Sequence, residues 1–216
     1  MNYDLQIRKK RAQVICQELK KLFPVAKPAL DYSNPWELLV AVILSAQCTD
    51  NRVNIVTKTL FKKYPKVKDY VDADTETFQQ DIRSTGFYKN KAKNILATAK
   101  IIHETYHDTL PKTMKEMIML PGVARKTANV VLSNAFGVIE GLAVDTHVRR
   151  LSQKFGLTKQ NDPSKIEQDL MQLLEKEEWS GFSLRLVDYG RAYSPARKKD
   201  YSDDPISQKL QQAGLL

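Results

Sequence analysis

Residues 119–128 decide the fold, and they read Met119-Leu120-Pro121-Gly122-Val123-Ala124-Arg125-Lys126-Thr127-Ala128. Pro121 ends a helix that precedes it, and Gly122 admits a backbone conformation that other residues avoid. A second helix is expected to begin directly afterwards, so that its first backbone N–H groups point out of the turn. Together with the positive end of the helix dipole, those groups can hold one phosphate. The same pattern also fits an ordinary helix corner in which Leu120 and Val123 fill the core.

Helix signals continue on both sides of this corner. Thr113 and Glu116 form a capping box that opens the first helix. The second helix is expected to run from about residue 125 to residue 136, with Gly137 just past its end. Other residues suited to capping a helix start are Asn34, Asp50, Asp145 and Asp162. Because no long stretch alternates apolar and polar residues as a half-buried strand would, the sequence predicts an all-α protein.

The chain of 216 residues is basic, since 34 Lys and Arg against 25 Asp and Glu give a formal net charge of +9. Such an excess favours a polyanionic partner, either nucleic acid or an acidic membrane face. A membrane is the less favoured partner, because the longest apolar run, residues 38–44, is too short to span a bilayer. Residues 1–21 lack the apolar core of a secretion signal, and Cys16 and Cys48 alone cannot form a disulfide framework. We therefore expect a soluble, cytoplasmic protein.

Four segments together resemble one known family. Residues 120–131 read Leu-Pro-Gly-Val-Ala-Arg-Lys-Thr-Ala-Asn-Val-Val, and residues 143–150 read Ala-Val-Asp-Thr-His-Val-Arg-Arg. Residues 35–50 hold Pro-Trp-Glu-Leu-Leu and Leu-Ser-Ala-Gln-Cys-Thr-Asp, and residues 86–92 read Gly-Phe-Tyr-Lys-Asn-Lys-Ala. In this order and at this spacing, they resemble the motifs of the endonuclease III family of DNA glycosylases. One departure lies in the hairpin, where Ala124 replaces the family's second glycine; the added methyl group puts the affinity for DNA in question.

The resemblance implies a bilobal helical fold. One lobe, a six-helix barrel over residues 29–137, would contain the helix–hairpin–helix of about residues 113–136. The other lobe would combine residues 1–28 with residues 138–216, and DNA would bind in a cleft between the two. The hairpin residues expected to contact DNA are Leu120, Gly122, Ala124, Arg125 and Thr127.

The resemblance also assigns a catalytic pair, with Lys126 as the nucleophile and Asp145 as its partner. An amine that attacks C1′ of the sugar expels the base and forms a Schiff base, after which the 3′ phosphate leaves by β-elimination. Only the uncharged amine attacks, and the positive helix end, the neighbouring Arg125 and partial burial are expected to favour that form. Asp145 would stabilise positive charge on the sugar, and it can also cap the helix that follows it.

The damaged nucleotide must leave the base stack before its C1′ can be reached. By resemblance, Gln47 fills the space left behind, and Phe87 is the wedge that unstacks the neighbouring pair. From the sequence alone, Phe87 also fits a core aromatic, and Gln47 also fits a residue capping a carbonyl at a helix end. Three nearby lysines would contact phosphates or be solvated: Lys89, Lys91 and Lys93. His147 is expected to make a local hydrogen bond rather than to bind a metal, because no second His or Cys lies at ligand spacing.

Most of the family carries a four-cysteine iron–sulfur cluster near the C-terminus. Aligning residues 190–194, Gly-Arg-Ala-Tyr-Ser, with the family's Gly-Arg-x-x-Cys places the four positions at Ser194, Tyr201, Asp204 and Leu210. None of them is a thiol, and cluster iron needs thiolates or, more rarely, imidazoles. We therefore expect no cluster, no other metal and no cofactor. Basic residues around the former site remain as candidate DNA contacts: Arg191, Arg197, Lys198 and Lys199.

The sequence thus predicts a monomeric repair enzyme that removes oxidised pyrimidines from duplex DNA and nicks the abasic site. A second reading is a glycosylase without lyase activity, specific for mispaired adenine or an alkylated base. The adenine-specific relatives usually lack a lysine at the position of Lys126. A third reading is a non-catalytic helix–hairpin–helix DNA-binding module, which would leave Lys126 and Asp145 as an accident.

Overall fold

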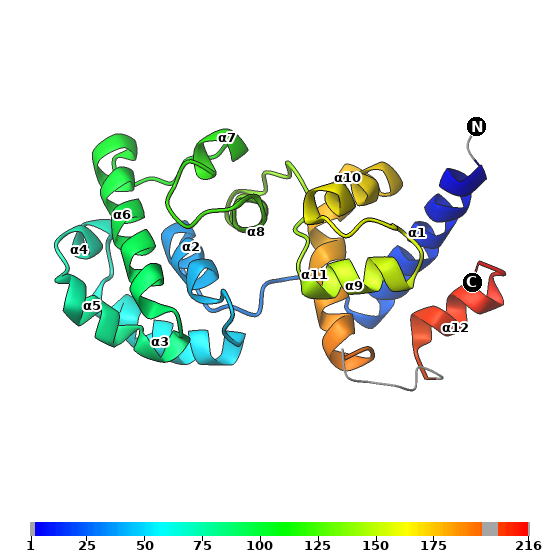
Figure 1. Ribbon diagram of the computed structural model, residues 1–216, viewed down its shortest axis with the longest axis horizontal. Coiled ribbons are helices and arrows are strands. Elements are labelled where there is room, and N and C mark those ends of the chain that lie inside the picture. The colour runs from blue at the N-terminus through cyan, green and yellow to red at the C-terminus, as the bar shows by residue number, and fades with distance from the viewer. Residues whose placement is uncertain (1–2, 196–202, 216) are drawn as a thin grey trace. The chain divides into compact units, whose positions relative to one another are not determined.

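The computed structural model describes residues 3–195 and 203–215. All regular secondary structure in these residues is helical, which confirms the all-α prediction (Figure 1). The chain divides into two compact units, residues 29–140 and residues 1–28 with 141–216. Each unit has a hydrophobic core of its own.

The unit of residues 29–140 contains one helix that is buried on nearly all sides, α2 (Pro35–Leu44). Asn34 caps α2 by accepting a hydrogen bond from the Glu37 N–H at 2.9 Å, and Pro35 occupies the first helical position. The rest of α2 is almost wholly apolar, and a helix that is apolar all round must be buried. The other helices of this unit are α3 (Asp50–Lys63), α4 (Val67–Val71), α5 (Thr75–Asp81), the 3₁₀ helix η1 (Arg83–Thr85), α6 (Tyr88–Tyr106), α7 (Met114–Met117) and α8 (Arg125–Phe136).

The start of α3 differs from the prediction by one residue. Thr49 has an extended backbone, and its side chain accepts a hydrogen bond from the Arg52 N–H at 3.4 Å. Asp50 is already the first helical residue, so the prediction that it caps the helix is wrong. Both residue types cap helices well, and the sequence alone does not separate two adjacent candidates.

An aromatic cluster joins several helices of this unit. Its four rings pack mostly edge to face, with neighbouring ring centroids 5.1 to 5.7 Å apart, and they belong to Trp36, Tyr64, Tyr70 and Phe78. Since these residues come from α2, the end of α3, α4 and α5, the cluster fixes the four helices to one another.

The second unit begins with α1 (Tyr3–Leu22), and the rest of its helices come from the C-terminal third of the chain. These are α9 (Thr146–Lys154), α10 (Pro163–Leu173), the 3₁₀ helix η2 (Lys176–Glu178), α11 (Trp179–Ala192) and α12 (Pro205–Gln212). Arg11 ties the two ends of the chain together, because its guanidinium donates to the carbonyls of Leu215 at 2.6 Å and Gly156 at 3.2 Å. Asp145 and Asp162 cap α9 and α10, as predicted. Among the described residues, no helix combines the length and the apolar character that crossing a bilayer would need.

Candidate functional site

The turn between α7 and α8 is held against α6. Gly122 has a φ of +75°, which glycine adopts without strain. A Cβ atom at this position would lie 2.8 Å from Nδ2 of Asn94 on α6. Thr98, one turn further along α6, donates from its hydroxyl to the carbonyl of Pro121 at 2.9 Å. The turn therefore requires a glycine for two reasons, its backbone angle and its close approach to α6.

The hairpin fills the core and also presents an open helix end. The side chains of Leu120 and Val123 are buried, as expected of an ordinary helix corner. No side chain caps α8, because its N-cap residue is Ala124. An uncapped first turn is what an anion-binding helix end requires. The backbone of Ala124 is extended, with a φ of −84°, so an alanine in place of the family's glycine introduces no backbone strain.

Four of the residues predicted to contact DNA line one hollow of about 220 Å³ in the unit of residues 29–140. Gln47 comes from the turn after α2, and Phe87 from the residue before α6. Gly122 and Thr127 come from the hairpin and the first turn of α8. The rest of the lining includes three residues on α6: Asn90, Lys91 and Asn94. The fold thus brings together three turns that are far apart in the sequence.

Gln47 and Phe87 both adopt the left-handed backbone conformation, with φ of 53° and 48°. For a residue with a side chain this conformation costs about 1–3 kcal/mol, and it persists where the surroundings impose it, often at functional sites. The side chain of Phe87 is 62% exposed, so it is not a core aromatic. Gln47 is also exposed and lies in the turn beyond the last residue of α2.

The two predicted catalytic residues lie at helix starts. Lys126 is in the first turn of α8 with an exposed side chain, so the expectation of partial burial is wrong. Asp145 is half-buried at the N-cap of α9, where its Oδ1 accepts a hydrogen bond from the Val148 N–H at 2.8 Å. This confirms the capping role. Because Lys126 and Asp145 belong to different units, their pairing across a cleft stays a prediction.

His147 lies in the first turn of α9 and packs against α11. Its Nδ1 atom is buried, and no hydrogen-bond partner for this atom lies in the described part of the chain. Gly190 on α11 approaches so closely that a Cβ there would collide with this nitrogen. The expected local hydrogen bond is therefore not made by Nδ1.

One of the three lysines near Phe87 is buried. Lys89 and Lys93 are exposed, whereas Lys91 is only 5% exposed. The Lys91 ammonium donates to the carbonyl of Leu44 and to the carbonyl of Thr85, both at 2.8 Å. The prediction that Lys91 contacts phosphates or is solvated is therefore wrong.

The positions that correspond to the cluster cysteines lie in the core of the second unit. Three of them are fully buried: Ser194, Asp204 and Leu210. The fourth, Tyr201, lies outside the described residues. One Asp204 oxygen accepts from the Lys154 ammonium at 2.6 Å, and the other accepts from the Tyr189 hydroxyl at 2.5 Å. Both oxygens of the Asp204 carboxylate are engaged in hydrogen bonds, and the Leu210 side chain has no atom that can bind iron. These residues therefore do not fit an iron–sulfur cluster.

Asp204 organises the polar network at this position. Its Oδ1 also accepts from the Ser207 N–H at 2.8 Å, which caps α12. Ser194 joins the network, since its hydroxyl accepts from the Lys154 ammonium at 3.2 Å and its carbonyl accepts from Arg150. Burial raises the pKa of the Asp204 carboxyl, and the hydrogen bonds from Lys154, Tyr189 and Ser207 lower it. The lowering is the larger effect, so the pKa lies below its ordinary value of 3.8.

The basic residues expected near the former cluster are only partly described. Arg191 is exposed on α11, and Lys198 lies outside the described residues, together with Arg197 and Lys199. In the part of the chain that the structure describes, no three His, Cys, Asp or Glu side chains are grouped to hold a metal ion.

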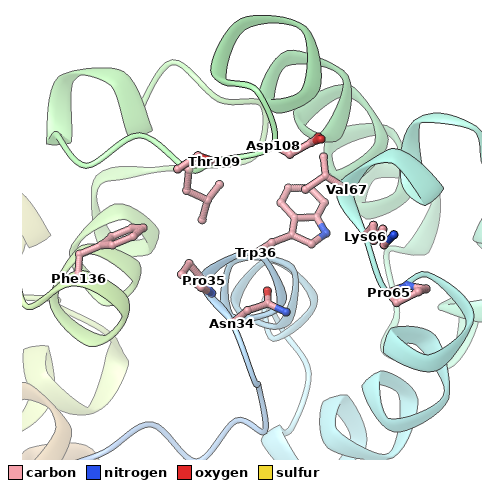
Figure 2. A pocket seen from close by; sticks show the side chains of 10 residues that line it. Asn34, Pro35, Trp36, Pro65, Lys66, Val67, Asp108, Thr109 and Phe136 are labelled. Atoms are coloured by element: carbon pink, nitrogen blue, oxygen red, sulfur yellow. The ribbon is translucent and has the colours of Figure 1, made fainter.

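A larger hollow of about 430 Å³ lies elsewhere in the unit of residues 29–140 (Figure 2). It is lined by the start of α2, the loops before α4 and after α6, and the end of α8, and the Trp36 ring lies among these side chains. None of the predicted site residues lines it. The smaller hollow is therefore the candidate site because strained and exposed residues converge on it, and its size plays no part in the choice.

A hairpin that presents an uncapped, basic helix end beside a hollow with exposed amide and aromatic side chains is suited to a nucleic-acid backbone and its bases. An all-helical chain with this hairpin is a helix–hairpin–helix DNA-binding protein in class.

Comparison with known proteins gives the family. Residues 40–176 match the model of the HhH-GPD superfamily of base excision DNA repair proteins. Endonuclease III of Synechocystis sp. is 52% identical over 191 residues, which are 88% of this chain and 87% of that protein. Endonuclease III of Bacillus subtilis is 44% identical over 214 residues, which are 96% of this chain and 97% of that protein. A solved structure of a trapped endonuclease III–DNA covalent intermediate has a TM-score of 0.88 at 40% identity, over 95% of this chain and 98% of that one. The chain therefore belongs to the endonuclease III family of the HhH-GPD superfamily.

Membership of the family confirms several predictions from the sequence. The protein is an enzyme of base excision repair, a DNA glycosylase with AP lyase activity, and its partner is DNA. The readings as a glycosylase without lyase activity and as a non-catalytic binding module are set aside.

Replacing Gly122 with alanine is expected to weaken both folding and DNA binding. The left-handed backbone alone costs an alanine about 1–2 kcal/mol. The overlap with Asn94 adds at least about 1 kcal/mol, as overpacking does in other cores. Gly137 is the matched control, because its φ is +66° and nothing lies within 4 Å of its added Cβ. Urea unfolding and DNA titration of Gly122→Ala and Gly137→Ala check this; equal losses of stability in the two variants would contradict it.

The Asp204 network is expected to make folding sensitive to acid. A carboxyl whose pKa is lowered by folding contributes stability that is present above its ordinary pKa of 3.8 and is lost as the pH falls through the folded value. Asp204→Asn is expected to lower the free energy of unfolding at pH 7 by about 2 kcal/mol, because the fully buried side chain gives up the charged hydrogen bonds that the carboxylate accepts from Lys154 and Tyr189. Asp72→Asn is the control, since the Lys68–Asp72 pair is exposed and contributes less than about 1 kcal/mol. The free energy of unfolding of wild type and of Asp204→Asn is measured from pH 7 to pH 3. A parallel loss of stability in the two proteins would show that Asp204 is not the source of the acid sensitivity.

Proposed function

We propose that this glycosylase and AP lyase removes oxidised pyrimidines from duplex DNA and cleaves 3′ to the abasic site by β-elimination. The observation that carries the proposal is the hollow shared by Gln47, Phe87, Gly122 and Thr127, with Lys126 exposed in the adjoining first turn of α8. This arrangement offers a phosphate anchor, two groups that can enter a base stack and an accessible amine within one unit.

Lys126 supplies the nucleophile. Its amine attacks C1′ of the everted nucleotide, the C1′–N bond breaks, and the base departs with the bonding electron pair and a proton. The C1′–O4′ bond of the resulting aminal then breaks, with O4′ taking a proton, and leaves an iminium between C1′ and the lysine nitrogen. The iminium acidifies the C2′ proton, and loss of that proton expels the 3′ phosphate. The exposure of Lys126 supports this role, because a buried amine would not reach the sugar. A solved endonuclease III structure that is 40% identical to this chain is a trapped covalent intermediate with DNA.

Asp145 stabilises positive charge on the sugar as the base leaves. One of its oxygens is held by the Val148 N–H, which fixes the orientation of the carboxylate. Preorganised charges of this kind need no rearrangement during the reaction, and they act most strongly where water is excluded.

Gln47 and Phe87 open the duplex. Phe87 wedges between base pairs, and Gln47 takes the space of the extruded nucleotide. Their exposure supports these roles, and so do their imposed left-handed backbones. The hairpin end of α8, with Arg125 and Thr127 in its first turn, binds a phosphate, and Arg191 adds a contact from the second unit.

The proposal includes the setting in which the enzyme works. It acts as a monomer on nucleoid DNA in the cytoplasm and uses no iron–sulfur cluster. Asp204 supports the last point, because it stands at one of the four cysteine positions and both of its oxygens are engaged by Lys154 and Tyr189. Iron and acid-labile sulfide analysis of the purified protein tests it.

Borohydride trapping on a duplex that contains thymine glycol tests the reaction. Wild type is expected to form a covalent adduct, and Lys126→Ala is expected to lose it by about 1,000-fold or more, as nucleophile deletions do. Lys62→Ala, which removes an exposed lysine on α3, is the control and is expected to trap like wild type. Undiminished trapping by Lys126→Ala would assign the nucleophile to another residue.

The same assay separates the two roles of Asp145 through Asp145→Asn. Asparagine caps helices as well as aspartate, so the free energy of unfolding is expected to change by less than about 0.5 kcal/mol. The loss of charge is expected to slow base release by about 100-fold. A variant that is stable and fully active would show that Asp145 only caps α9.

A further inference from the structure

Lys91 joins the two segments that lead into the turns of Gln47 and Phe87 by hydrogen bonds. Its ammonium donates to the carbonyl of Leu44, the last residue of α2, and to the carbonyl of Thr85, the last residue of η1. Gln47 follows Leu44 by three residues, and Phe87 follows Thr85 by two. The buried ammonium of Lys91 thus links the end of α2, which precedes Gln47, to the end of η1, which precedes Phe87.

The geometry suits an ammonium group. The last carbonyls of a helix have no partner within the helix, and its C-terminal end carries partial negative charge. A lysine ammonium is a compact charge with three donors, so it can bind two carbonyls from different segments at once.

Burying this charge is unfavourable unless something compensates. Lys91 is 5% exposed, and no carboxylate among the described residues forms an ion pair with it. Burial accordingly lowers the pKa of its amine. A methionine would fill similar space without the charge, so the shape of the core alone gives no reason for a lysine. The two carbonyls that it binds do give a reason, and Lys91 itself is one of the residues that line the hollow.

We propose that Lys91 is a positioning residue for base opening, which holds Gln47 and Phe87 in register on the two sides of the hollow. This rests on the proposed function, in which those two side chains enter the duplex. Lys91 itself is buried and does not touch the everted sugar. Its role is therefore needed when a paired base must be extruded, and it is needed much less when the base is already missing.

The experiment compares two substrates with one enzyme set. The first is a duplex with thymine glycol opposite adenine, and the second is the same duplex with an abasic site at that position. Lys91→Met is expected to slow single-turnover cleavage of the first by about 10- to 100-fold, the order seen when positioned groups shift by about an ångström. On the second substrate its rate is expected to stay within about threefold of wild type, because no base has to be unstacked.

A second measurement reports the opening step directly. The fluorescence of 2-aminopurine placed beside the thymine glycol rises when its stacking is broken, and this rise is expected to shrink in Lys91→Met at saturating enzyme. Lys91→Arg keeps the charge and the donors and is expected to recover part of the lost rate, which a defect of packing alone would not allow. Lys100→Met is the control on the same helix, since Lys100 is exposed and lies beyond the hollow.

The outcomes separate the two hypotheses. Equal losses on both substrates, or no loss on either, would overturn the positioning role of Lys91. If Lys91→Met does not fold, a Lys91→Arg variant with equal losses on both substrates would overturn it too. If wild type forms no borohydride adduct with the abasic duplex, the proposed function itself fails, whatever Lys91 does.

Discussion

The candidate DNA-binding surface depends on hydrogen bonds and close contacts made by one face of α6. Lys91, Asn94 and Thr98 are spaced by three and four residues, so their side chains lie along the same side of the helix. Lys91 binds the ends of α2 and η1, Asn94 packs against Gly122, and Thr98 binds the carbonyl of Pro121. The turns that carry Gln47, Phe87 and Gly122 are thus all held in place by contacts with α6 or by its hydrogen bonds. A site built on such a helix keeps its geometry better than one carried by loops alone.

The same surface carries positive charge, which suits the negatively charged backbone of DNA. The N-terminus of α8 has no capping side chain, and its first turn carries two basic residues. By contrast, α2, α9 and α10 each have a side-chain cap. A capped helix end gains stability from its own chain, and an uncapped one gains it when an anion binds. The uncapped start of α8 is therefore suited to gain stability from a bound phosphate.

Local chemistry made much of this molecule predictable from its sequence. The hairpin, the all-helical fold and the caps at Asn34, Asp145 and Asp162 follow from proline, glycine and capping residues within a few positions. The burial of Lys91 was not predictable in this way, because Lys89 and Lys93 beside it are exposed and nothing in the local pattern separates the three. The face of α6 on which each lysine lies decides whether it is buried. Residue 91 shares the α6 face of Asn94 and Thr98, and both face the hairpin. No local pattern predicts a pairing of Lys126 with Asp145 either, because the two residues belong to different compact units.

A polar network around Asp204 stabilises the second unit at the positions that correspond to the family's cluster cysteines. A metal cluster binds its ligands by covalent bonds that do not depend on exact packing, whereas the network around Asp204 works only if every donor is in place. Arg150 and Lys154 come from α9, Tyr189 comes from α11, and Asp204 caps α12. The docking of α12 therefore depends on the ionisation of one carboxyl and on the packing of Leu210 into the core. The stability of this unit is therefore expected to fall in acid, as the Asp204 carboxylate takes up a proton.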